Sequence, residues 1–153
     1  MSRVSRGLAV AALPIVALVV SVAPRAAASP EKVFVQRVPG AEQTLYYRPH
    51  VFYLSADGAL TLTGVKWHSY GGPTATASAV AHTNDCDPFC LAGTFTTHPT
   101  KLRLSGRTYC RARGREIYAR LRIHILGRIP DNFGDGRESL SMRPVDVDGD
   151  PIC

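Results

Sequence analysis

Apolar and polar residues alternate with a period of two along much of residues 50–126, the spacing that predicts β-strands. In residues 74–82, alanine occupies every second position, and the β-branched residues between the alanines favour a strand over a helix. In residues 116–126, a helix would place arginines in its apolar stripe, so a strand fits better. We expect Ile117, Ala119, Leu121, Ile123 and Ile125 to face inward, and Tyr118, Arg120, Arg122, His124 and Leu126 to face the other way.

Glycine and proline separate the alternating stretches. Asp57-Gly58, between two β-prone runs, predicts a hairpin because glycine adopts the positive φ of a tight turn. After Gly64 the apolar phase shifts by one residue, which predicts a β-bulge. Further strands are expected at 95–104, interrupted by Pro99 and followed by a turn at Ser105-Gly106, and at 140–147. The fold class is therefore all-β, a small antiparallel sandwich or barrel of about seven strands.

Residues 1–28 have the organisation of a secretory signal peptide. Two arginines precede an apolar run of 15 residues, 8–22, and small residues lead to a predicted cleavage site after Ala28. That run is shorter than the roughly 20 residues that a transmembrane helix needs, so we expect secretion and no integral membrane span. Residues 29–44 are polar and predict a flexible N-terminal arm with one short strand at 33–38. Residues 45–153 then form a single β domain stabilised by disulfides.

Charge is unevenly distributed along the chain. The whole sequence has a net charge of +6, whereas residues 29–153 hold 15 basic and 12 acidic residues and a net charge of +3. Within them, residues 101–128 have a net charge of +8 and residues 129–153 a net charge of −4. The segments are therefore more informative than the overall charge, and they describe a polarised protein.

The basic residues of 101–128 alternate with apolar ones along the two predicted strands 95–104 and 116–126. They are therefore expected on one outward face if these two strands are neighbours. Such a face attracts polyanions and binds them more weakly as salt increases. We expect an anionic polymer of the envelope or medium as the partner, because aromatic residues are too sparse to favour nucleic acid. A merely solubilising face is the alternative. The candidate binding residues are Lys101, Arg103, Arg120, Arg122 and His124, with Arg111, Arg113 and Arg115 in the loop between the strands.

The chain contains four cysteines, Cys86, Cys90, Cys110 and Cys153. An even number in an exported protein predicts two disulfides with three possible connectivities. We favour a distant partner for each of the first two, one bonding to Cys110 and the other to Cys153, because a ring closed by the first two would be small and strained. A zinc site that includes His82 or His98 is the alternative, but the spacing matches no zinc finger and the compartment is oxidising.

Other chemistry finds little support in the sequence. No Gly-x-Ser-x-Gly motif is present, so the five histidines and the serines do not define a catalytic triad. Residues 146–150 begin like a calcium loop, but Pro151 stands where such a loop needs glycine, and the glutamate at position twelve is missing. We therefore expect no enzymatic activity, no cofactor and no metal.

Several segments carry a resemblance: 60–62 leading to Trp67 and Tyr70-Gly71, the alternating alanine strand, the loop 84–93, and Cys110 before Tyr118. Together they resemble a group of small secreted actinobacterial proteins, most specifically through the N-D-C-x-P-x-C-x-x-G pattern of the loop. The resemblance covers roughly residues 50–126. It implies secretion and a compact disulfide-bonded domain, and it supplies neither a function nor a catalytic residue.

The same loop supports a second hypothesis, that the protein is an interaction module such as an inhibitor of another secreted protein. Residues 86–93 would be the inserted element, with Phe89 at its centre. Disulfides would make the loop rigid and so reduce the entropy lost on binding.

Overall fold

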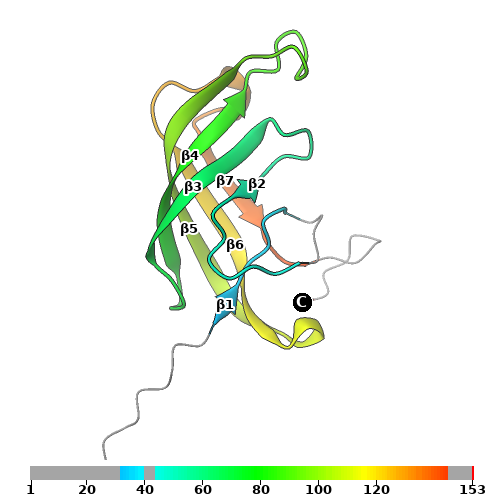
Figure 1. The fold of residues 1–153 in the computed structure, drawn as a ribbon, viewed down its shortest axis with the longest axis vertical. Helices are drawn as coiled ribbons and strands as arrows, with labels where there is room; N and C mark the ends of the chain where they lie inside the picture. Colours follow the sequence, from blue (N-terminus) through cyan, green and yellow to red (C-terminus); the bar gives the residue numbers. More distant parts are fainter. Residues whose placement is uncertain (1–31, 40–43, 145–152) are drawn as a thin grey trace, which may run out of the picture.

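The computed structural model describes residues 32–39, 44–144 and 153. Seven strands form one sheet that curls around an apolar core as a half-barrel (Figure 1), and the described residues contain no α-helix. The all-β prediction is confirmed, with one curled sheet rather than two stacked layers. No helix among these residues is long and apolar enough to cross a membrane. The elements are β1 (Val33–Phe34), β2 (Phe52–Tyr53), β3 (Leu60–Ser69), β4 (Ala75–Asn84), β5 (Phe95–Cys110), β6 (Arg115–Ile125) and β7 (Arg137–Ser141), with 3-10 helices η1 (Arg111–Arg113) and η2 (Asp131–Phe133).

The strand order is β1-β6-β5-β4-β3-β2, and β7 also pairs with β6. All neighbours are antiparallel except β1, which runs parallel to β6. β1 and β7 share one edge of β6, because β1 pairs with residues 116–117 and β7 with residues 120–124. The loop between β4 and β5 lies at one end of the sheet, and η1, between β5 and β6, lies at the other (Figure 1).

The predicted hairpin and bulge are both present. Gly58 has a φ of 78°, and the Leu54 amide donates to the Leu60 carbonyl at 2.9 Å, which closes the turn between β2 and β3. Gly64 has a φ of 60°, at a register shift between β3 and β4. Because the shift inserts one residue, Leu62 and Val65 both face the core despite their odd spacing.

The alanine strand forms one wall of the core. Ala75, Ala77, Ala79 and Ala81 of β4 are all buried, and Trp67 lies opposite Ala77 on the neighbouring strand. Small methyl groups leave room for the indole ring, which packs edge-on against Tyr70 with ring centroids 4.6 Å apart. The aromatic rings of the core therefore pack against a flat alanine surface, beside the leucines, isoleucines and valines that make up most of the buried cluster.

The predicted turn at Ser105-Gly106 is wrong, since β5 continues without a break to Cys110. Gly106 has a φ of 68° but keeps its place in the register with β6. This left-handed residue shifts the inward face by one position, so Tyr118, which we predicted to face outward, is fully buried in the core. Burial raises the pKa of Tyr118, whose hydroxyl donates to the Gly72 carbonyl at 2.8 Å.

The described part of the predicted flexible arm belongs to the sheet. Val33 and Val35 are fully buried, and Val35 exchanges two backbone hydrogen bonds with Tyr46 at 3.0 and 2.8 Å. A short strand is therefore present where one was expected, but it spans 33–34 rather than 33–38. The last strand spans 137–141 rather than 140–147, and residues 145–147 lie outside the described residues, as do the signal segment 1–28 and the acidic residues 146–150.

Candidate functional site

The strand register places basic side chains directly opposite one another on β5 and β6. Lys101 is opposite His124, and Arg103 is opposite Arg122. Residues opposite each other in a ladder share a face, and the intervening Leu102 is buried on the core side. These four side chains therefore lie together on the outer face of the sheet, as the alternation predicts.

These residues line an open cavity of about 460 Å³ on that face, which we call the basic groove. β4 contributes the short side chains of Thr76 and Ser78, which pair with Arg103 and Lys101 in the register. Because threonine and serine are much shorter than the cations beside them, the surface is hollowed along β4. The volume lies in the range of about 300–1,000 Å³ that is typical of ligand sites.

The cations of the groove are free to bind a ligand. Lys101, Arg103 and Arg122 are exposed and form no ion pair with any described residue. Arg107, four positions beyond Arg103 on the same strand, is different: its Nε donates to the Glu116 carboxylate at 3.0 Å. The protein therefore neutralises a structural arginine and leaves those of the groove uncompensated.

The structure separates the other predicted basic residues from the groove. Arg120 lies on the same face opposite Ser105, but it opens onto a smaller cavity of about 260 Å³ next to β7. Arg115 is seven residues from Arg122 along β6, or about 23 Å at 3.3 Å per residue, and its guanidinium lies 4.5 Å from the centre of the Phe34 ring. Arg111 and Arg113 lie in η1, at the same distant end of the sheet.

His68 of β3 also lines the basic groove, and sequence reasoning missed it. The pairing of β3 with β4 has a second register shift between Trp67 and Ser69, where His68 lies. Simple alternation cannot predict which side chains flank a shift of this kind.

The disulfides are Cys86–Cys90 and Cys110–Cys153, so the predicted pairing is wrong. Cys110 is the last residue of β5, whereas Cys86 and Cys90 lie in the loop before the first residue of that strand. The two ends of the strand are 15 residues apart, which is about 50 Å in extended conformation. Neither loop cysteine can therefore reach Cys110. Within the loop, Cys86 has a φ of 56° and its Cα lies 3.7 Å from that of Cys90, so the chain reverses sharply enough for the neighbours to bond.

Polar side chains of the loop motif hold this reversal in place. The Asn84 amide donates to the Cys90 carbonyl at 2.7 Å and accepts from the Cys86 amide at 2.9 Å. Asp85 accepts from the Thr94 amide at 2.8 Å. A Cβ on Gly93 would collide with the Asn84 side chain and come within 2.8 Å of the Cys86 nitrogen, so only glycine fits there.

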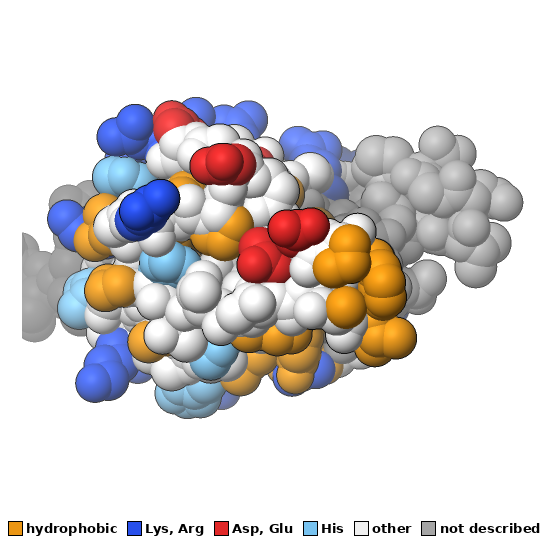
Figure 2. Space-filling model, turned by 90° about the horizontal axis from the view of Figure 1, so that it is seen from above, with side chains coloured by type: hydrophobic (Ala, Val, Ile, Leu, Met, Phe, Trp, Pro, Cys, Tyr) orange, Lys and Arg blue, Asp and Glu red, His pale blue; other side chains and the backbone are white. Residues whose placement is uncertain are grey.

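The remaining loop residues are displayed to solvent. Phe89 is 58% exposed, Leu91 95% and Phe95 59%. Asp87 in the same loop and Asp57 in the neighbouring turn are also exposed, and no basic residue occurs between 84 and 95. We call residues 84–95 together with Asp57 the tip. Figure 2 looks onto this end of the molecule and shows acidic side chains beside a group of hydrophobic ones.

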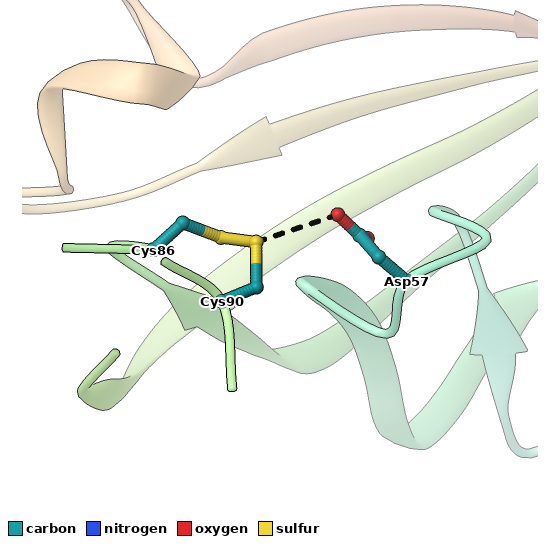
Figure 3. Close-up of side chains that lie close together, drawn as sticks. All are labelled: Asp57, Cys86 and Cys90. Carbon is teal, nitrogen blue, oxygen red and sulfur yellow. Dashed lines mark hydrogen bonds between the residues drawn. A yellow bond between two sulfur atoms is a disulfide. The ribbon is translucent and has the colours of Figure 1, made fainter. Parts of the chain in front are cut away.

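Asp57 lies against the loop disulfide, with its Oδ2 3.6 Å from Cys90 Sγ (Figure 3). A disulfide sulfur has no hydrogen to donate, so this is a contact rather than a hydrogen bond. The backbone amide of Ala59 and the Ser55 hydroxyl lower the pKa of Asp57. Asp57, Cys86 and Cys90 have ligand atoms close enough for a metal, but metals bind thiolates, and these sulfurs are bonded to each other.

Comparisons with protein-family models, curated proteins and solved structures find no match. Function therefore has to be argued from the surfaces of this molecule. The two disulfides are typical of proteins that fold in an oxidising compartment.

Proposed function

We propose that this protein is exported and that its basic groove binds an anionic polymer of the cell envelope or medium. The observation that carries the proposal is the set of uncompensated cations, Lys101, Arg103 and Arg122, around one hollow. Unpaired charges of one sign are costly to gather because they repel each other, and an anionic ligand relieves that repulsion. His124 adds a fourth nitrogen-bearing side chain to the same rim.

The spacing of the cations favours a ligand with repeated anionic groups. Lys101 and Arg103 are about 6.6 Å apart along β5, and their partners lie about 4.8 Å away across the ladder. A polymer that crosses the groove contacts several cations at once and releases the counterions bound to it. The arginines offer forked donors that fit phosphate, sulfate and carboxylate groups.

Export is supported by the signal-like segment 1–28 and agrees with the two disulfides. The resemblance to small secreted actinobacterial proteins favours the same location. Cleavage after Ala28 would leave a secreted chain of 125 residues that begins shortly before β1.

Chromatography of the secreted protein on immobilised heparin tests the groove directly. We expect retention at low salt and elution as salt increases, with Arg103→Ser eluting at clearly lower salt than the wild type. Arg111→Ser is the matched control, because it removes the same charge from an exposed site at the other end of the sheet. Absence of retention, or equal losses in the two variants, would overturn the proposal.

A further inference from the structure

The tip exposes an apolar surface that the fold itself does not use. Phe89, Leu91 and Phe95 are each more than half exposed, and the loop that presents them is braced by a disulfide and by Asn84. A braced loop loses little entropy on binding. Contiguous exposed apolar side chains on a soluble protein mark an interaction surface.

The tip is acidic as well as apolar. Asp57 and Asp87 are exposed at this end of the molecule, and the loop holds no lysine or arginine. An occupied tip therefore needs a partner surface that combines cations with apolar surface.

The basic groove of the same protein has this combination. Its rim holds three cations that form no ion pair with a described residue, and the aliphatic parts of these long side chains offer apolar surface beside the charges. We infer that the tip of one molecule occupies the basic groove of a second copy, a contact that rests on the proposed function of the groove as an anion-binding site. The exposed carboxylates of Asp57 and Asp87 take the place of the polymer.

The tip cannot reach the groove of its own molecule. Phe95 and Lys101 are on the same strand, about 20 Å apart in a rigid ladder. The contact therefore joins two different surfaces on two copies, and it leaves a free groove on one copy and a free tip on the other. Repeated head to tail, such heterologous contacts form open chains, or rings where the rotation between copies closes.

The tip is a single loop, so the contact belongs to the small interfaces that bury less than about 1,200 Å², which are weak and transient. An anionic polymer competes for the same cations and is therefore expected to dissociate the chains. Self-association would thus regulate access to the groove.

Sedimentation velocity of the full secreted protein at low salt, from about 10 µM to about 1 mM, tests the inference. We expect the weight-average sedimentation coefficient of the wild type to increase with concentration and to return to the monomer value when salt or heparin is added. Leu91→Ser removes the tip contact and Arg103→Ser removes the groove contact. Because both side chains point into solvent, each variant is expected to fold normally and remain monomeric.

Mixing the two variants gives the decisive result. Leu91→Ser keeps an intact groove and Arg103→Ser an intact tip, so an equal mixture is expected to form heterodimers that grow no further. A wild type that stays monomeric throughout, variants that associate like the wild type, or a mixture that stays monomeric would each overturn the inference. Heparin retention of the monomeric Leu91→Ser reports the proposed function separately, since failure there concerns the groove as a polymer site alone.

Discussion

The basic groove and the tip are built on the same β4–β5 hairpin but by different means. The groove depends on the register of three long strands, which brings side chains from β4, β5 and β6 together. The tip depends on contacts within a dozen residues, where Asn84, Asp85 and one disulfide fix the chain reversal. Residues that shape the groove point into solvent, whereas residues that shape the tip point into the loop.

This difference separates function from stability in the two regions. A groove cation can be replaced without disturbing the sheet, because the backbone ladder and the buried side chains hold the strands. A residue of the tip motif cannot be replaced without disturbing the loop, because its side chain forms hydrogen bonds with backbone groups of the loop. Substitutions in the groove should therefore change binding alone, and substitutions in the tip motif should change stability and tip binding together.

The largest expected effects come from the disulfides. Loss of Cys110–Cys153 in the double variant Cys110→Ser/Cys153→Ser opens a ring with a sequence separation of 43, which lowers the free energy of unfolding by about 4 kcal/mol on the chain-entropy account. The ring closed by Cys86 and Cys90 has a separation of 4, for which the same account gives about 2 kcal/mol. Urea unfolding measures both values.

Only the loop pair should affect the tip. We expect Cys86→Ser/Cys90→Ser to abolish concentration-dependent association while its heparin retention stays at the wild-type value. If this variant also loses its heparin retention, that result would contradict the separation of the two regions.

The next effect is expected from Gly93→Ala. The added Cβ meets the carboxamide oxygen of Asn84, a carboxylate oxygen of Asp85 and the backbone nitrogen of Cys86. The loop must therefore shift, which lowers the free energy of unfolding by about 1–3 kcal/mol. Thermal unfolding measures the loss. Gly72→Ala is the control, since its nearest contact would be the Thr74 carbonyl at 3.6 Å, an ordinary distance. A Gly93→Ala variant as stable as this control would show that the tip is not tightly braced.

A smaller loss is expected from Gly106→Ala, at the position where the inward face of the sheet shifts. A left-handed φ costs an alanine about 1–2 kcal/mol, although the added Cβ has room, with its nearest neighbour at 3.7 Å. The prediction is a moderate decrease in urea stability with unchanged heparin retention. A gain in stability would contradict the conformational reason for this glycine.

The smallest effect concerns pH and Asp57. Hydrogen bonds from the Ala59 amide and the Ser55 hydroxyl lower the pKa of Asp57 in the folded protein. Its contribution to stability is therefore fully present above the ordinary aspartate pKa of about 4, and it is lost as the pH falls through the lowered value. The difference in melting temperature between the wild type and Asp57→Asn should shrink below about pH 4, and a difference that grows there would contradict this assignment.

Much of the sheet could be predicted from the sequence, because alternation and glycine positions report local geometry. They located the hairpin at Gly58, the bulge at Gly64 and the outward cations of β5 and β6. The errors arose where a single dihedral decides the outcome. Gly106 keeps the chain in its strand and turns Tyr118 inward, and Cys86 reverses the chain so that it bonds to its neighbour.

The groove itself was only partly predictable. Alternation shows which cations face outward, but it does not show which of them share a hollow. Arg120 and His68 illustrate the limit, since strand pairing places the first beside β7 and the second on the groove. Such choices depend on contacts between strands far apart in the sequence.

The proposed function requires that the groove cations themselves bind the polymer. Fluorescence anisotropy with labelled inorganic polyphosphate, repeated over a series of salt concentrations, measures how many charges take part. Arg103→Ser/Arg122→Ser is predicted to reduce the slope of log Kd against log salt by about two. The control Lys32→Ser/Arg111→Ser removes equal charge from the exposed surface elsewhere and should leave the slope unchanged. Equal slopes in the two double variants would contradict the account.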